Sequence, residues 1–162
     1  MDLTLITPRI FEIITAIRSD LLVYLPLIGA WLITASYFIL NHDEKHGHAH
    51  VVSTGIAHIF TAYMISPFAI PDIQWSFSDT RTIVVAALFV YGVFLIILGI
   101  SKAFPDLLAE FFGDPGHALV PSLMAVLYVQ ENIPFDWLTF FIIAVPVLIL
   151  SAIKISRKFR RK

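Results

Sequence analysis

Long apolar runs without charge alternate with short polar segments along most of the chain. Four runs of 17 to 20 residues contain no Asp, Glu, Lys or Arg, and they cover residues 21–40, 51–70, 83–100 and 137–153. A helix of about 20 residues, rising about 1.5 Å per residue, spans the roughly 30 Å hydrocarbon core of a bilayer. The pattern therefore predicts four membrane-spanning helices.

The remaining apolar pieces are shorter or amphipathic. Residues 9–20 place isoleucines at helical spacing on one face and charged residues on the others, which predicts an amphipathic helix at a membrane surface or capping its own bundle. Residues 104–113 separate phenylalanines and leucines from two acids, which predicts a short interfacial helix. The run 118–129 is only 12 residues long and contains Pro121, so we expect a re-entrant helix or a short span.

Composition supports the same fold class. The 162 residues are 58% hydrophobic and only 14% charged, whereas soluble domains are about 25% charged. This balance excludes disorder, a coiled coil and a free nucleic-acid-binding domain, and the absence of cysteine excludes disulfides and thiolate metal sites. We predict one all-α integral membrane domain over residues 1–162, a bundle of four to five transmembrane helices with an N-terminal amphipathic helix and a short interfacial helix. Because the first run starts late, is long and lacks a basic leader, we expect a retained span rather than a signal peptide.

Basic residues are concentrated in the tail, residues 154–162, which holds six of the eleven Lys and Arg. This excess predicts a cytoplasmic C-terminus, with the plasma membrane as the expected location. With four spans the cytoplasmic side holds nine of the eleven Lys and Arg, the six tail residues included, and with five spans it holds eight. We therefore expect four spans, and five are the alternative. The tail residues expected to set topology and meet anionic headgroups are Lys154, Arg157, Lys158, Arg160, Arg161 and Lys162.

A histidine-rich loop separates the first two runs. In an extended segment His46, His48 and His50 would all point to one side, as capture of a divalent metal requires. In a helix His42, His46 and His50 would share a face instead, although Gly47 weakens a helix there. Imidazole and carboxylate ligands without sulfur suit copper or zinc. The candidate ligands are His42, Asp43, Glu44, His46, His48 and His50. A solvated turn and a pH-sensing loop are the alternatives.

His58 lies well inside the second apolar run. An ionisable side chain at that depth is expected to face the bundle interior rather than lipid. Thr54 and Thr61, four residues before it and three after, share its helical face and form a polar stripe. The simplest interpretation is a neutral histidine hydrogen-bonded to another helix. A haem axial ligand, a second metal site and a proton-path residue are the alternatives.

Small residues mark one further face. Gly92 and Gly99 lie seven positions apart in the third run, so they fall on the same side of a helix. Such a smooth face allows another helix to approach closely. We predict close packing there, either within the chain or against a partner.

The expected function follows from these features. The chain contains no G-x-S-x-G, H-E-x-x-H, P-loop or GxGxxG motif, and its long runs carry no buried acid or base for an ion pathway. We expect a non-catalytic accessory or structural subunit of a larger membrane complex, in contact with lipid and other membrane-protein subunits and not with nucleic acid. A copper- or haem-dependent oxidase or monooxygenase, or a respiratory assembly, is the expected host. The alternatives are a small metal-cation transporter or metal-delivery protein that uses the histidine-rich loop, and a lipid-acting enzyme with His58 or His117 as base.

Overall fold

The computed structural model describes residues 3–19, 24–25, 27–29, 32, 36, 47–66, 76–103, 105–131 and 133–159. This part of the chain is all-helical, which confirms the predicted helical class. Its elements are η1 (Leu3–Leu5), α1 (Ile6–Ser19), α3 (His48–Met64), α4 (Thr80–Ser101), α5 (Asp106–Phe112), α6 (Pro115–Glu131) and α7 (Trp137–Phe159). Most of the predicted span 21–40 lies outside the described residues.

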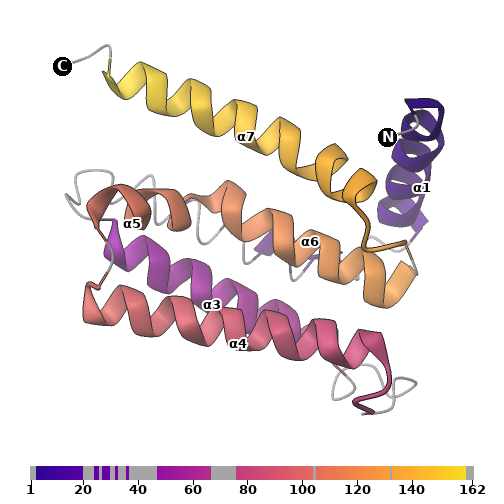
Figure 1. Ribbon diagram of the computed structural model, residues 1–162, viewed down its shortest axis with the longest axis horizontal. Helices are drawn as coiled ribbons and strands as arrows, with labels where there is room; N and C mark the ends of the chain where they lie inside the picture. Colours follow the sequence, from indigo (N-terminus) through magenta and orange to yellow (C-terminus); the bar gives the residue numbers. More distant parts are fainter. Residues whose placement is uncertain are drawn as a thin grey trace.

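Helices α3 and α4 form an antiparallel pair in which glycines face each other (Figure 1). A Cβ atom on Gly55 of α3 would lie 2.6 Å from the carbonyl oxygen of Gly92 of α4, and one on Gly92 would lie 2.7 Å from that of Gly55. Gly99 meets the carbonyl oxygen of His48 in the same way, at 2.9 Å. Only glycine lets two backbones come this close. The small-residue face predicted from Gly92 and Gly99 therefore packs within the chain.

Helices α5 and α6 together follow this pair, α5 at the end where α3 begins and α6 from there to the other end (Figure 1). Helix α6 begins just after Gly113, whose added Cβ would lie 2.6 Å from the Cβ of His50 near the start of α3. Beyond its last turn, Ile133 joins the same buried cluster as Ile65, which follows the end of α3. The two ends of the segment between α4 and α7 thus lie at opposite ends of the bundle. Pro121 lies inside α6, and the helix continues through it.

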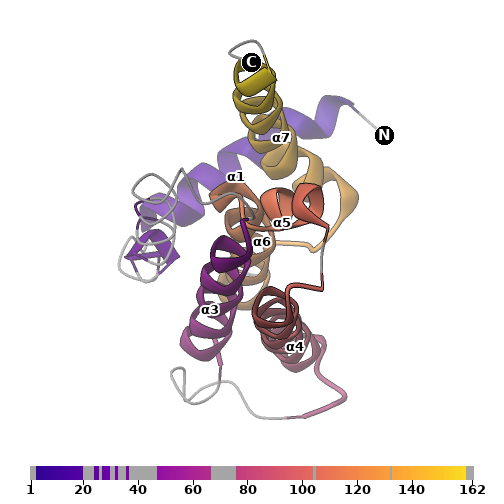
Figure 2. The same cartoon turned by 90° about the vertical axis from the view of Figure 1, so that its left-hand side faces the viewer.

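Helix α7 packs on α6 and α1, and its carboxyl end lies at the same end of the molecule as the start of α3 (Figure 1). Helix α1 lies crosswise at the opposite end, where α6 finishes and α7 begins (Figures 1 and 2). The N-terminal amphipathic segment thus caps one end of the bundle.

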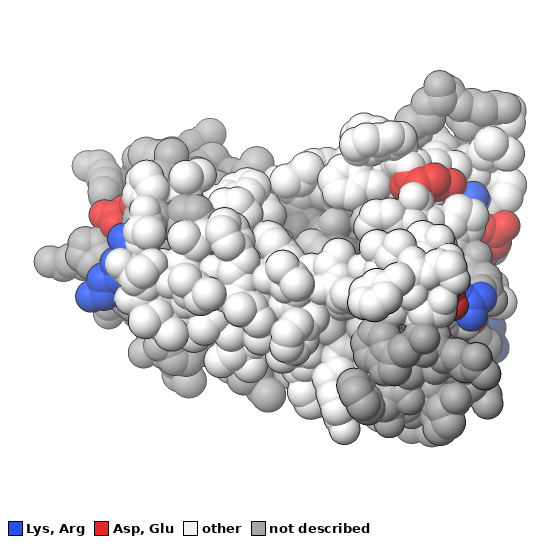
Figure 3. Space-filling view, turned by 60° about the horizontal axis from the view of Figure 1, so that its bottom comes forward, with Lys and Arg blue, Asp and Glu red and all other residues white. Residues whose placement is uncertain are grey.

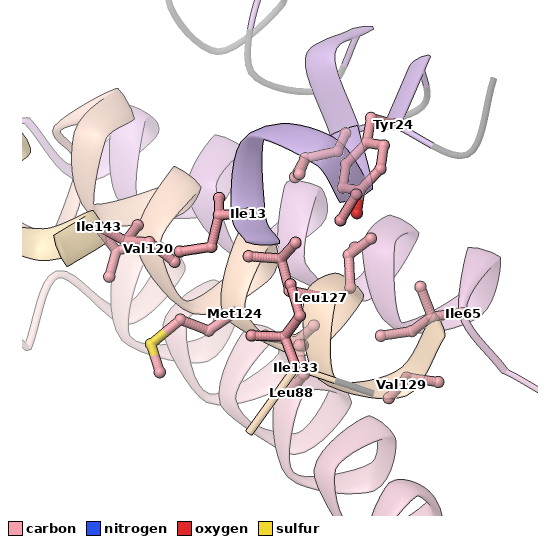
Figure 4. Close-up of a cluster of buried hydrophobic side chains, with 14 of the residues drawn as sticks. Ile13, Tyr24, Ile65, Leu88, Val120, Met124, Leu127, Val129, Ile133 and Ile143 are labelled. Atoms are coloured by element: carbon pink, nitrogen blue, oxygen red, sulfur yellow. The ribbon is translucent and has the colours of Figure 1, made fainter. Parts of the chain in front are cut away.

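The main hydrophobic core lies beneath α1. Ile13 of α1 and Leu88 of α4 belong to the same buried cluster as Leu127 of α6, which is fully buried (Figure 4). A second, smaller cluster at the other end joins Val51 of α3, Leu95 of α4 and Ala109 of α5. Burial of such side chains contributes about 1.5–3 kcal/mol each before the entropy of ordering is subtracted.

Local backbone chemistry sets the helix ends. The carboxylate of Asp79 accepts a hydrogen bond from the Arg81 N–H at 2.9 Å, which caps the first turn of α4. Lys102 ends α4 in the left-handed conformation, with φ 52°. Gly47 precedes α3 with φ 62°, and a Cβ there would lie 3.1 Å from the backbone nitrogen of Glu110. The start of α3 is therefore held against α5.

Charged side chains in the described part lie toward the two ends of the bundle. Helix α3 carries none, α4 carries one in its first turn and α6 one at its last residue. On the face shown in Figure 3, acidic and basic side chains gather at both ends with an uncharged surface between them. Among the helices searched in this part, α4 is the one long and apolar enough to cross a membrane by length and composition.

Candidate functional site

A buried histidine lies where three helices meet. His58 occupies the middle of α3 and is 0% exposed. Its Nδ1 lies 2.8 Å from the Oγ of Ser122, a buried residue of α6 that is 64 positions away in sequence. Either ring tautomer is compatible with this hydrogen bond, because a hydroxyl both donates and accepts. The contact ties α3 to α6 by a polar bond inside an otherwise apolar interior.

Helix α4 closes the third side of the site. The Tyr91 ring lies against the imidazole of His58, with the ring centroids 5.1 Å apart and the planes tilted by 46°. This separation falls within the usual range for aromatic pairs, about 4.5–7 Å. His58 therefore has neighbours on both helices that pack against α3.

The polar stripe predicted around His58 is buried with it. Thr54 and Thr61 are 1% and 2% exposed. The Thr61 hydroxyl donates to the Ala57 carbonyl oxygen at 2.8 Å, within its own helix. Among the described residues, neither the Thr54 hydroxyl nor Nε2 of His58 has a hydrogen-bond partner. Buried polar groups are nearly always hydrogen-bonded, so these two atoms can each form a further hydrogen bond, to a water molecule or another small polar group.

Sequence reasoning missed Ser122, the partner of His58. The hydroxyl stands next to Pro121, which has no N–H and so leaves the His117 carbonyl oxygen without its usual helical donor. A serine inside a short apolar run was a signal that could have pointed to a buried polar contact. Its partner could not be read from the sequence, since the two residues lie on separate helices.

The histidine-rich loop reaches the described residues only at its end. His48 and His50 are buried in the first turn of α3 and lie near α5. Because the chain is helical from His48, these two side chains point in different directions, unlike in the extended arrangement considered for metal capture. The other candidate ligands, His42, Asp43, Glu44 and His46, lie outside the described residues.

Within the residues that the structure describes, no three His, Cys, Asp or Glu side chains are grouped to hold a metal ion. Copper or zinc binding by the loop stays a prediction. His117, at the start of α6, packs on Phe111 of α5 with ring centroids 3.8 Å apart, and neither of its ring nitrogens has a hydrogen-bond partner in the part of the chain that the structure describes. The side chains of the basic tail, residues 154–162, lie outside the described part.

A charged cluster joins α1 to the start of α7. Arg9 of α1 donates from Nη2 to Oδ2 of Asp136 at 3.4 Å, and its Nε lies 3.4 Å from the carboxylate of Glu12. The Thr139 N–H donates to Oδ1 of Asp136 at 2.8 Å, which caps α7. Partial burial acts to raise the pKa of Asp136, but hydrogen bonding by Thr139 and the charge of Arg9 lower it more, and the net pKa lies below its ordinary value.

Comparisons with family models, with curated proteins and with solved structures give no match to this chain.

Proposed function

We propose that the chain is an integral membrane protein with five apolar passes and that it serves as a non-catalytic accessory subunit of a larger membrane complex. The observation that carries the membrane assignment is the uncharged belt between two charged ends (Figure 3). Residues 82–101 of α4 contain no charged side chain. At about 1.5 Å per residue they cover roughly 30 Å, the thickness of the hydrocarbon core.

Side-chain exposure supports this assignment. Large apolar residues of α4 point outward along the belt, with Val90, Ile97 and Ile100 exposed by 64%, 58% and 70%. In water each exposed apolar Å² costs about 25 cal/mol, and soluble monomers seldom expose contiguous patches beyond a few hundred Å². Lipid or a neighbouring apolar helix removes that cost.

The path of α6 favours five passes over four. Helices α3, α4 and α7 each extend toward both ends, and α5 with α6 connects the end of α4 to the opposite end, where α7 begins (Figure 1). In this proposal the predicted span 21–40 is the remaining pass. Eight of the eleven Lys and Arg then lie on the side of the basic tail, counting Lys45, Lys102 and the six tail residues. The positive-inside rule places that side in the cytoplasm. A plasma-membrane location is part of the same proposal.

Helix α7 supports the subunit assignment. Phe141, Val145 and Leu148 follow helical spacing and are all exposed, so they form one apolar stripe on α7. Helix α7 packs on α6 and α1 among the described helices, and this stripe is left uncovered by them. An apolar stripe at this spacing suits a helix of another membrane-protein subunit.

Single-cysteine labelling tests the topology, because the natural chain contains no cysteine. Ser78→Cys, Lys102→Cys and Phe135→Cys are each labelled in sealed vesicles with a membrane-impermeant maleimide. With five passes, positions 78 and 135 react from one side and position 102 from the other. If positions 102 and 135 react from the same side, the chain has four spans. Recovery of the chain in the soluble fraction would overturn the membrane assignment.

Native extraction tests the subunit role. The chain is released from its membranes in mild detergent, sized on a native gel and analysed for co-migrating chains and bound metal. We expect a large complex of fixed composition. A chain that runs alone or as a small homo-oligomer overturns the subunit proposal, and stoichiometric metal in that form would support the metal-transport alternative instead.

A further inference from the structure

A pocket opens between α1 and the segment that joins α6 to α7. Its volume is about 710 Å³, and its lining includes Arg9 and Glu12 of α1 and Glu131 at the end of α6. Apolar side chains complete it, among them Phe11 of α1 and Ile133. The pocket thus combines one guanidinium, two carboxylates and an apolar wall.

The hydrogen-bonding capacity of Arg9 is not used up. Its contacts with Glu12 and Asp136 are both 3.4 Å long, whereas charge-assisted N–H···O bonds are about 2.7–2.9 Å. The third guanidinium nitrogen, Nη1, is buried and has no hydrogen-bond partner among the described residues. The side chain is only 16% exposed, so its charge acts in a partly desolvated setting. Arg9 can therefore bind an additional anionic oxygen.

The charges around Arg9 restrict the ligand. Glu12 and Glu131 line the pocket, and Asp136 lies beside it, so carboxylates outnumber the guanidinium. A purely anionic ligand meets net repulsion there. A zwitterion that pairs a phosphate with a primary ammonium matches the site, because the phosphate binds Arg9 and the ammonium donates to the carboxylates.

The position of the pocket identifies the source of such a zwitterion. Helix α1 lies crosswise at one end of the bundle (Figure 1), and charged side chains gather at the ends of the bundle (Figure 3). Phe11, which lines the pocket, and Ile14 on the same helix are 64% and 55% exposed and offer apolar surface for acyl chains. We propose that this pocket binds the headgroup of an ethanolamine phospholipid, with the phosphate on Arg9 and the ammonium on Glu12 and Glu131. This inference rests on the proposed membrane location.

Native mass spectrometry of the full chain tests the proposal. The delipidated protein in detergent is offered equal amounts of phosphatidylethanolamine, phosphatidylcholine and phosphatidylglycerol with the same acyl chains. We expect the ethanolamine lipid to be retained at least fivefold over the choline lipid, whose quaternary ammonium has no N–H donor. Equal retention of the two, or preference for the anionic glycerol lipid, overturns the proposal.

Variants assign the effect to the pocket. Arg9→Gln is expected to abolish the preference, whereas Arg18→Gln, on the same helix outside the lining, keeps it. Glu131→Gln leaves the Arg9 contacts intact and is expected to cut the preference over the choline lipid. If Arg9→Gln does not fold, Glu131→Gln alone tests whether the pocket binds the lipid. An unchanged preference in Glu131→Gln refutes binding of the ammonium by Glu131.

Two further controls separate the sources of failure. Soluble phosphoethanolamine at millimolar concentration is expected to leave the lipid bound, and complete displacement would identify a soluble ligand instead. Cysteine labelling at positions 78, 102 and 135 is run on the same protein in vesicles. If labelling gives the expected sides and no lipid preference exists, the lipid inference alone fails; if labelling fails, the membrane proposal fails.

Discussion

The contact between Gly55 and Gly92 provides a quantitative test of how α3 and α4 pack. In Gly55→Ala the new Cβ would lie 2.6 Å from the Gly92 carbonyl oxygen and 2.7 Å from Cγ1 of Ile96. To reach the about 3.3 Å usual for C···O contacts, the two helices must separate by roughly 0.7 Å. A gap of that size removes about a quarter to a half of the dispersion attraction across the contact.

Two opposing terms set the magnitude. Overpacking a well-packed interface costs about 1–3 kcal/mol, while replacing glycine by alanine inside a helix gains about 1 kcal/mol. Subtracting the gain from the cost, we expect Gly55→Ala to lower the free energy of unfolding by up to about 2 kcal/mol. Gly92→Ala should act in the same way, since its Cβ would lie 2.7 Å from the Gly55 carbonyl oxygen. The double variant should cost less than the sum, because one separation relieves both clashes.

Denaturant titration in detergent, followed by far-UV circular dichroism, measures these differences. Gly29→Ala is the matched control: Gly29 is helical, and an added Cβ there meets nothing within 4 Å. We expect this variant to be as stable as the parent or more stable, by up to about 1 kcal/mol. If Gly55→Ala is as stable as Gly29→Ala, the backbones are not in the close contact described, and the reasoning is wrong.

Two more predictions concern polar contacts. Ser122→Ala leaves Nδ1 of buried His58 without its partner and should lower the free energy of unfolding by about 1–3 kcal/mol in the same titration. The control Ser101→Ala, at an exposed position, should change stability little. Equal effects of the two variants would contradict the proposed role of the buried hydrogen bond. Because the folded-state pKa of Asp136 is lowered, its stabilising contribution is present above the unfolded pKa and is lost as the pH falls through the folded value. Asp136→Asn should therefore be less stable than the parent at pH 7, with a difference that shrinks toward low pH, and a constant difference across a pH series of unfolding curves would refute this.

The periodicity of the sequence predicted which residues share a helical face. It did not predict which other helix that face contacts. Gly92, Gly99 and His58 were identified because their positions in apolar runs are unusual. Their partners on other helices, such as Gly55 and Ser122, were not, because pairing between helices depends on tertiary packing.

Other features could not be predicted because the effect of a single residue depends on its neighbours in the fold. The short run with Pro121 predicted a re-entrant helix or a short span, and the helix itself is longer than the run, from Pro115 to Glu131. A proline removes one hydrogen bond, and packing of α6 against α3, α4 and α7 compensates for that loss. His48 and His50 were considered as part of an extended loop, whereas Gly47 in a left-handed conformation starts a helix there. The sequence did contain that signal, since glycine is favoured before a helix.

The hydrogen bond between His58 and Ser122 also has a consequence for biosynthesis. Ribosomes make the chain from its N-terminus, so α3 and α4 are complete while Ser122, 64 positions after His58, is still to be added. The glycine contacts between α3 and α4 need no later segment, whereas Nδ1 of His58 must wait for α6. In the nascent hairpin Nδ1 of His58 therefore lacks its partner, and arrival of the third helix supplies that partner. The pair makes assembly of this unit sequential, with α6 as its last component.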